Sequence, residues 1–410
     1  PISGYCLKLS FGIMVDRILI AGAGPAGLSL AAYLTKANIP VCIFEAEASL
    51  PKNLRASTFH PPTLDFLEPF GASKVLIDEG LIAPTFQYRD RKNGCLAEFD
   101  FNLISAETNH PFRVQCEQFK LNLHLLDWLS KQGVDDIYFN HKIKGVEQTG
   151  DEVAVIADTP NGEQSYNGNL LIGADGANSA VRQLSGINFE GFTWEDRFLV
   201  VSTAFDYKKY IEDLSFVNYY ADPEQWFFLL KVPGLWRVMF PVQRDEKDGD
   251  IFNAESIEKR MQWVQASSDT FEVAHKTLYN VHQRVATDYR KGRIFLIGDA
   301  AHINNPLGGM GMNGGIHDAF NLAEKITDFW HNRENASVLD LYEKQRRPIA
   351  LEYVNKQSIK NKQNLEAKTP EAQGQFREFL AELMEDKQRA REYMMRVSMI
   401  SSLRDASEIG

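Results

Sequence analysis

The chain has few cysteines and none in a paired spacing. It contains 4 cysteines in 410 residues. They are Cys6, Cys42, Cys95 and Cys116, and no two of them form a Cys-x-x-Cys pair. This number and spacing exclude a disulfide framework of the kind that holds small secreted domains together. We therefore expect a reducing, cytoplasmic setting, and we predict no metal site.

Basic residues and long apolar runs are also scarce. The chain has 44 Lys and Arg against 55 Asp and Glu, a net charge of −11, which argues against nucleic acid as a partner because phosphate binding needs a basic face. Apolar runs such as residues 170–172 are far shorter than the roughly 18 residues of a membrane span. Residues 1–13 lack the ordered parts of a signal peptide. We interpret them as a cloning remnant or upstream read-through and exclude them from the fold.

The first motif present is a glycine-rich turn between two apolar strands. Residues 17–21 and 41–44 are predicted to be buried parallel strands, joined by Gly22-Ala-Gly-Pro25-Ala26-Gly27 and a helix. In this pattern Gly22 makes the tight turn, Gly24 lets the backbone approach a pyrophosphate, and Gly27 allows close helix packing. Glu45 follows the second strand, 18 residues after Gly27, and is expected to bind ribose hydroxyls. The motif alone predicts a dinucleotide without saying which one.

A second motif lies about 270 residues further along and favours FAD over NAD. Residues 294–297 are predicted to form a buried strand that ends in Gly298-Asp299, followed by small residues and a helix starting near Met312. An aspartate at the carboxyl end of a strand can bind ribityl hydroxyls. A helix start can hold the negative charge of a reduced flavin ring. An NAD dehydrogenase has no need of such a second site.

The remaining segments predict an α/β fold with an inserted sheet. A helix is expected at 118–129, and strands at 153–156 and 170–172, before Gly173-Ala-Asp175-Gly176. Residues 198–242 are rich in Val, Tyr, Phe and Trp and predict an antiparallel substrate layer. After Asp318 the pattern is helical, with an apolar stripe at 376, 379, 380, 383 and 384. We expect a discontinuous Rossmann-like FAD-binding domain (14–75, 100–187 and 285–345), a β-sheet substrate domain (76–99 and 188–284) and a C-terminal helical region (346–410).

Three motifs in this order carry a family resemblance. Gly22-x-Gly-x-x-Gly27, the Gly173-Ala-Asp-Gly segment and Gly298-Asp-Ala-Ala-His302, with the Pro306-x-Gly loop after the last, resemble the single-component (group A) FAD-dependent monooxygenases typified by para-hydroxybenzoate hydroxylase and phenol hydroxylase. The resemblance covers roughly residues 15–345 and is weakest in the inserted sheet.

The resemblance implies roles for individual residues. The FAD-binding positions that it implies, besides the first glycine motif and Glu45, are Arg55, Gln118 (with Gln115 as a rival), Asp175, Asp299, Gly309, Gly311, Met312 and Asn313. Pro306 matches a proline near the oxygen-activating carbon of the flavin, and Arg237 matches an arginine of the substrate sheet that helps to position the ring. Asp175 has a structural alternative as a turn aspartate.

The substrate side is less well defined. Ser57 stands where phenol hydroxylase has an active-site aspartate, and the tyrosine pair of para-hydroxybenzoate hydroxylase has no counterpart that we can place. His60 is the nearby candidate base, with a packed or hydrogen-bonded loop histidine as the favoured alternative. Tyr220 and Trp226, which share strand parity, are predicted to line the pocket. His302 and the Met394, Met395 and Met399 group are interpreted as structural.

The family resemblance implies an NADH- or NADPH-dependent hydroxylase of an aromatic or heteroaromatic substrate, working through a flavin C4a-hydroperoxide formed with O2. We expect a monomer or homodimer. A flavin-dependent halogenase is an alternative, although its Trp-x-Trp-x-Ile-Pro signature is absent. Reductase-type chemistry and an FAD-retaining binding protein are further alternatives.

Overall fold

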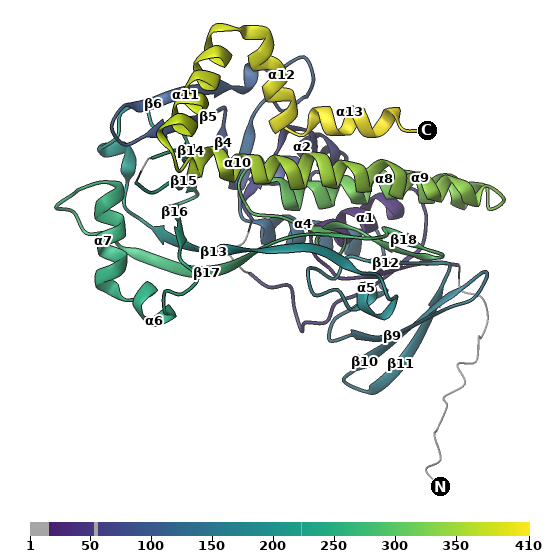
Figure 1. Cartoon of the computed structure of the whole chain (residues 1–410). Helices are drawn as coiled ribbons and strands as arrows, with labels where there is room; N and C mark the ends of the chain where they lie inside the picture. Colours follow the sequence, from purple (N-terminus) through teal and green to yellow (C-terminus); the bar gives the residue numbers. More distant parts are fainter. Residues whose placement is uncertain (1–15, 53–55, 223) are drawn as a thin grey trace.

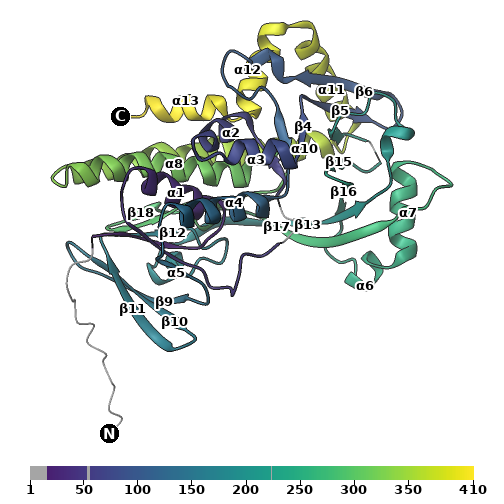
Figure 2. The same cartoon turned by 180° about the vertical axis from the view of Figure 1, so that it is seen from behind.

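A computed structural model describes residues 16–52, 56–222 and 224–410. Figures 1 and 2 show two sheets joined by two long strands, with the C-terminal helices lying across both. The fold class is α/β, as the sequence predicted. Arg55 lies outside the described residues. No helix in the described part of the chain has the length and apolar character needed to cross a bilayer.

The first sheet has six strands in the order β18-β19-β12-β1-β2-β8. All neighbours are parallel except β18 and β19. The strands are β1 Ile18–Ala21, β2 Val41–Phe44, β8 Ile137–Tyr138, β12 Leu170–Gly173, β18 Arg290–Lys291 and β19 Ile294–Leu296. The strands β1, β2 and β12 are buried along their whole length, which explains why the sequence shows continuous apolar runs there instead of alternation.

Helices cover one face of this sheet and a small antiparallel sheet covers the other (Figure 1). The covering helices are α1 (Pro25–Lys36), α4 (Gln118–Lys131) and α8 (Met310–His331). The opposite face carries α5 (Ala180–Leu184) and β9 (Lys142–Gln148), β10 (Val153–Thr159) and β11 (Gly162–Gly168). The predicted strands and the helix at 118 are confirmed, and α8 begins two residues before the predicted Met312.

The second sheet has eight strands in the order β20-β17-β13-β16-β15-β14-β5-β6. The strands are β5 Thr85–Asp90, β6 Gly94–Asp100, β13 Phe189–Thr203, β14 Val217–Tyr220, β15 Phe227–Val232, β16 Leu235–Val242, β17 Val273–Ala286 and β20 His302–Ile303. The antiparallel character predicted for 198–242 is confirmed. Only the β14–β5 pairing is parallel. The long strands β13 and β17 extend from the first sheet to the far end of the molecule (Figures 1 and 2).

The two faces of the second sheet pack against different helices. One face packs with α11 (Pro370–Glu385) and α12 (Lys387–Val397). The other packs with α7 (Ala254–Val264).

The remaining helices and strands are β3 Thr58–Phe59, β4 Leu81–Ala83, β7 Arg113–Gln115, α2 Pro61–Leu67, α3 Ala72–Glu79, α6 Asp248–Ile251, α9 Asp340–Ile349, α10 Gln357–Glu366 and α13 Ile400–Glu408. Of these, β3, β7 and β4 form a three-stranded sheet of their own.

The C-terminal helices mostly follow the predicted apolar pattern. Thr369 caps α11 by accepting a hydrogen bond from Ala372 N, and Pro370 occupies the first turn, where no intrahelical donor is needed. Three stripe positions, at 376, 380 and 383, are buried. Met384 is 42% exposed, so its assignment to the buried stripe was wrong. Position 384 lies in the last turn of α11, next to the buried Leu383, and its side chain is exposed. Met394, Met395 and Met399 are buried packing residues, as expected.

Candidate functional site

The first glycine motif forms a tight loop between β1 and α1. Gly22 has a φ of +105°, and a Cβ at this position would lie 2.3 Å from Ala174 O. A Cβ on Gly27 would lie 2.1 Å from Gly22 O. Gly24 differs from both, because a Cβ there would meet nothing within 4 Å. The loop therefore uses two of its glycines for packing and leaves the surface over the third open.

The helix that follows this loop presents free donors. Gly24 is the N-cap of α1 and provides no side-chain cap, and Pro25 occupies the first turn. Glu45, directly after β2, accepts hydrogen bonds from Ala23 N (2.9 Å) and Glu47 N (3.0 Å). The carboxylate is thus fixed beside an uncapped helix start. This geometry fits a pyrophosphate at the helix and a ribose at the carboxylate.

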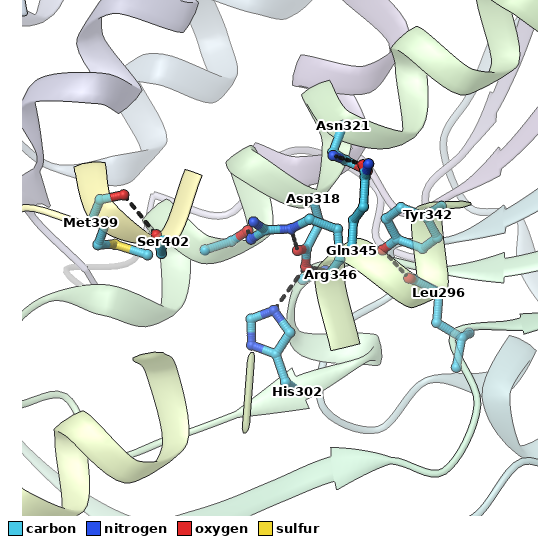
Figure 3. A network of polar contacts seen from close by, with 11 residues as sticks. Leu296, His302, Asp318, Asn321, Tyr342, Gln345, Arg346, Met399 and Ser402 are labelled. Atoms are coloured by element: carbon cyan, nitrogen blue, oxygen red, sulfur yellow. Dashed lines mark hydrogen bonds and ion pairs between the residues drawn. The ribbon is translucent and has the colours of Figure 1, made fainter. Parts of the chain in front are cut away.

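The second motif lies at the carboxyl end of β19, where Gly298, Asp299 and Ala300 form a single 3-10 turn. Asp299 is exposed, as a residue that binds a ligand from solvent must be. The neighbouring backbone is held from below by Asp318 of α8. Its Oδ2 accepts from Gly298 N (3.2 Å) and from His302 Nε2 (2.8 Å). Figure 3 shows His302 and Arg346 converging on Asp318. The interpretation of His302 as structural is supported.

The buried carboxylate is stabilised in its charged form. Arg346 Nε donates to Asp318 Oδ1 over 2.7 Å, and the two side chains are 1% and 0% exposed. Burial by itself raises the pKa of Asp318, but the positive Arg346 and the contact with His302 outweigh it and lower the pKa to about 2. Around this pair, Tyr342 donates to Leu296 O and Asn321 to Gln345 (Figure 3). The network holds α8, α9 and β19 together beneath the Asp299 turn.

The loop after this motif ends in the start of α8. Gly308 and Gly309 have φ values of +101° and +67°, a conformation that side chains disfavour. Gly309 is the N-cap of α8 without a side-chain cap, so the first N–H groups, including those of Gly311 and Met312, have no helical acceptor. Pro306 is exposed at the beginning of the loop. The turn therefore offers backbone donors to a ligand.

Asn313 and His60 lock this loop onto β3. Asn313 accepts from His60 N (2.9 Å) and donates to Thr58 O (2.8 Å) and Gly309 O (2.6 Å). His60 is fully buried, and its Nε2 lies 2.8 Å from Gly308 O. Burial, followed by the nearby charge of Arg113, lowers the pKa of His60 well below its usual value. A neutral imidazole that donates to a carbonyl positions the loop, and its role as a base stays a prediction.

Arg237 of β16 approaches the same region from the second sheet. Its Nη1 donates to Ser57 Oγ over 3.0 Å, and both residues are buried. Burial lowers the pKa of the guanidinium, while the Glu117 carboxylate opposes this shift. The structure thus brings together two positions that the sequence separated by 180 residues.

The other predicted cofactor residues differ in their surroundings. Gln118 begins α4 and is partly exposed, whereas Gln115 is buried and accepts from Thr58 Oγ1 (2.8 Å). Asp175 caps α5 by accepting from Ser179 Oγ, Ala180 N and Val181 N, which supports the structural alternative for this residue. Ala26 packs under the second motif, where a Cβ on Gly298 would lie 3.2 Å from its Cβ.

A cavity that the sequence did not predict lies beside the start of α8. Its walls combine aromatic, apolar and polar residues: Phe86, Tyr88, Arg113, Tyr219, Gly308, Met310, Asn361, Tyr393 and Val397. The Tyr88 and Tyr393 hydroxyls are 3.0 Å apart. Burial raises the pKa of both phenols, that of Tyr393 to about 12. No local pattern could have joined these two tyrosines, which are 305 residues apart.

Tyr220 does not lie on the face that holds this cavity, contrary to the prediction. It stacks on Phe227 with 4.1 Å between ring centroids, on the side packed by α7. Trp226 packs edge-on against Phe198 on the opposite face and is not among the residues lining the cavity. The two side chains were expected on one face because side chains alternate along a strand. The chain leaves the strand between β14 and β15, so this alternation does not continue from residue 220 to residue 226.

Comparisons with known proteins agree with this geometry. The sequence pattern of the family described as FAD binding domain matches residues 16–357. The para-nitrophenol 4-monooxygenase of Pseudomonas sp. (strain WBC-3) is 31% identical over 350 residues, which are 85% of this chain and 86% of that protein. The chain belongs to the single-component FAD-dependent aromatic monooxygenases. It is an oxidoreductase with FAD as its cofactor.

Two further relatives support the same assignment. The 6-hydroxy-3-succinoylpyridine 3-monooxygenase of Pseudomonas putida is 31% identical over 366 residues, with 87% of this chain and 91% of that protein covered. The crystal structure of p-nitrophenol 4-monooxygenase from Pseudomonas putida superposes with a TM-score of 0.87 at 27% identity, covering 94% of this chain and 98% of that one. The family resemblance drawn from the three motifs is confirmed.

Proposed function

We propose that this monooxygenase takes its electrons from NADH or NADPH and hydroxylates a phenol-like aromatic or heteroaromatic compound. When bound, reduced FAD supplies the oxygen transfer, through a C4a-hydroperoxide formed with O2. One observation carries the choice of substrate class: the cavity beside Gly308 and Met310 is lined by four aromatic rings. Two of the relatives are named for a nitrophenol and a hydroxypyridine, which supports the same class.

The chain's residues would divide the work between holding the cofactor and shaping the site. Gly22, Gly24 and Gly27 give the pyrophosphate its approach to α1, Glu45 binds the ribose, and Asp299 binds the ribityl chain. The N–H groups at the start of α8 would donate hydrogen bonds to the flavin ring and stabilise its reduced, negatively charged form. The domain division predicted from the sequence then stays a proposal: FAD on the segments 14–75, 100–187 and 285–345, the substrate on 76–99 and 188–284, and a helical region at 346–410.

The residues around the reacting edge then position it and exclude water. His60 holds Gly308, Arg237 reaches Ser57 from the second sheet, and Pro306 lies at the exposed end of the loop. The buried contacts of His60 and Arg237 would shield the reacting edge from water, which disfavours loss of hydrogen peroxide. A monomeric or homodimeric state and a cytoplasmic location stay predictions.

The test is NADH and NADPH oxidation by the FAD-loaded protein, with and without a panel of phenols, hydroxypyridines and hydroxybenzoates. We expect at least one compound to raise the rate ten-fold or more, which corresponds to about 1.4 kcal/mol of barrier, and to gain one oxygen atom from labelled O2. The FAD-free protein is the control for flavin-independent oxidation.

The alternatives make different predictions in the same assay. An FAD-retaining binding protein would show no stimulation by any compound, and a reductase-type enzyme would oxidise the nicotinamide without putting labelled oxygen into the product. A halogenase would need a separate source of reduced flavin and a halide ion. Any of these results with the whole panel would contradict the proposed function.

A further inference from the structure

Arg113 is a buried cation without a counter-ion in the described part of the chain. It belongs to β7 and is 2% exposed. Its guanidinium lies 4.8 Å from the centre of the Phe86 ring and 5.4 Å from that of Phe101. Among the described residues, Nε and Nη1 have no hydrogen-bond acceptor, and no carboxylate forms an ion pair with it. The side chain is therefore desolvated and held mainly by aromatic faces.

Two other buried arginines among the described residues have a carboxylate or carbonyl acceptor. Arg346 pairs with Asp318, and Arg182 donates to the carbonyls of Ala300 and Ala177. Buried charges are normally paired because an isolated ion loses its hydration without compensation. Two aromatic faces replace only part of that hydration. Arg113 thus differs from Arg346 and Arg182, and a bound anion would complete its surroundings.

The position of Arg113 connects it with the reacting end of the site. It lines the cavity that also includes Gly308 and Met310, at the start of α8. No lining residue is acidic. The charge of Arg113 acts on Tyr88, Tyr393 and His60, favouring phenolate over phenol and neutral over protonated imidazole. Its field therefore favours negative charge throughout the cavity.

We propose that Arg113 binds a negatively charged oxygen of the aromatic substrate, so that the enzyme selects arenes bearing a phenolate or carboxylate over their neutral analogues. This inference rests on the proposed function for the identity of the ligand as substrate. The cavity is narrow, with a volume of about 10 Å³, so its aromatic walls move apart to admit the ring. The guanidinium then fixes one charged oxygen, and the ring is thereby oriented toward the start of α8. Phenolate and carboxylate share the required chemistry, and the test separates them.

The experiment is calorimetric binding to the FAD-loaded protein, which does not depend on turnover. The probes are two matched pairs: 4-nitrophenol above its own pKa with 4-nitroaniline, and benzoate with benzamide. We expect the wild type to bind at least one anion about ten-fold or more tightly than its neutral partner. The pair that shows the preference identifies the anionic group. In Arg113→Met that ratio falls to about one, and in Arg113→Lys it is intermediate.

The control variant is Arg260→Met, which removes an arginine on α7 that pairs with Glu246 and should leave the ratio unchanged. Equal binding of anion and neutral partner by the wild type, no binding of either anion, or an unchanged ratio in Arg113→Met would overturn the inference.

If Arg113→Met does not load FAD, a crystal structure of the wild type with the preferred anion decides. A charged oxygen within hydrogen-bonding distance of the guanidinium supports it, and one pointing elsewhere refutes it. Failure of the oxidation assay, in contrast, refutes the proposed function and leaves these binding ratios readable.

Discussion

Arg346 donates a hydrogen bond from Nε to Asp318 Oδ1, and this pair lies directly beneath the turn that carries Asp299. The same carboxylate accepts from the backbone N–H of Gly298 through its other oxygen. One buried ion pair therefore fixes the backbone next to the predicted ribityl-binding residue. This links the packing of α8 and α9 to the geometry of the cofactor site.

Asp318→Asn should weaken both the fold and FAD binding. The substitution leaves Arg346 buried without a charged partner, a loss of about 3–5 kcal/mol in comparable buried pairs. Because Gly298 N loses a strong acceptor, the Asp299 turn loosens as well. Chemical denaturation and titration of the apoprotein with FAD measure the two effects. Asp328→Asn, an exposed position on the same helix, is the control. A stable Asp318→Asn variant with normal FAD affinity would refute the link.

The same pair should make stability fall in acid. The pKa of Asp318 is lowered from its ordinary value to about 2, so its ionised form contributes stability above about pH 4, and this contribution is lost as the pH falls toward 2. The shift corresponds to about 2 kcal/mol. We expect the difference in unfolding free energy between wild type and Asp318→Asn to shrink over this pH interval. A constant difference would show that the charge of Asp318 does not carry the effect.

Most of the first sheet could be predicted because its strands are buried on both faces. The continuous apolar runs at 18–21 and 170–173 are each followed by a glycine-containing turn, so they are too short to be helices and are interpreted as strands. The second sheet was predicted in type but not in the direction of its side chains. Tyr220 and Trp226 lie on opposite faces because the segment between them is not a strand.

The site could be predicted only where its residues sit close together in the sequence. The glycine loop and the Gly298-Asp299 turn are local motifs with a fixed geometry. The cavity joins β5, β7 and α12, and Tyr88 meets Tyr393 only through the packing of the C-terminal helices on the sheet. Arg113 carried no signal in the sequence, because an isolated arginine is usually a surface residue. Its burial without a partner is visible only in three dimensions.

Gly24→Ala should separate cofactor binding from folding. A Cβ at this position meets no protein atom within 4 Å, and the φ of −80° is allowed for alanine. The fold should therefore tolerate the change, while FAD binding falls if the pyrophosphate lies against this surface as proposed. Thermal unfolding of the apoprotein and FAD titration measure the two. Gly374→Ala, an equally open glycine in α11, should stabilise its helix by roughly 0.5–1 kcal/mol and leave FAD affinity unchanged. Normal FAD affinity in Gly24→Ala would exclude the proposed contact.

The hydroxyl contact between Tyr88 and Tyr393 predicts a role in substrate ionisation. Burial keeps both phenols neutral at ordinary pH, with the pKa of Tyr393 raised to about 12. The phenol's proton can pass to the first tyrosine hydroxyl while that hydroxyl passes its own proton to the second, and the partly exposed Tyr393 then releases a proton to solvent water. Arg113 favours the phenolate that remains. Removing one hydroxyl breaks this chain of hydrogen bonds. The effect depends on whether the substrate arrives as a phenol or already ionised.

Tyr393→Phe should therefore lower kcat/KM for a phenol about 100-fold at pH values below the phenol's own pKa, and much less above it, where no proton has to leave. The pH profile of kcat/KM, measured for one phenol across its own pKa, tests this. Tyr353→Phe is the matched control, because Tyr353 is buried, whereas Tyr393 is partly buried, and Tyr353 donates to Asp405 on the C-terminal helix α13. A parallel loss at every pH would indicate a packing role for Tyr393 instead. A profile identical to that of the wild type would show that the hydroxyl takes no part in the reaction.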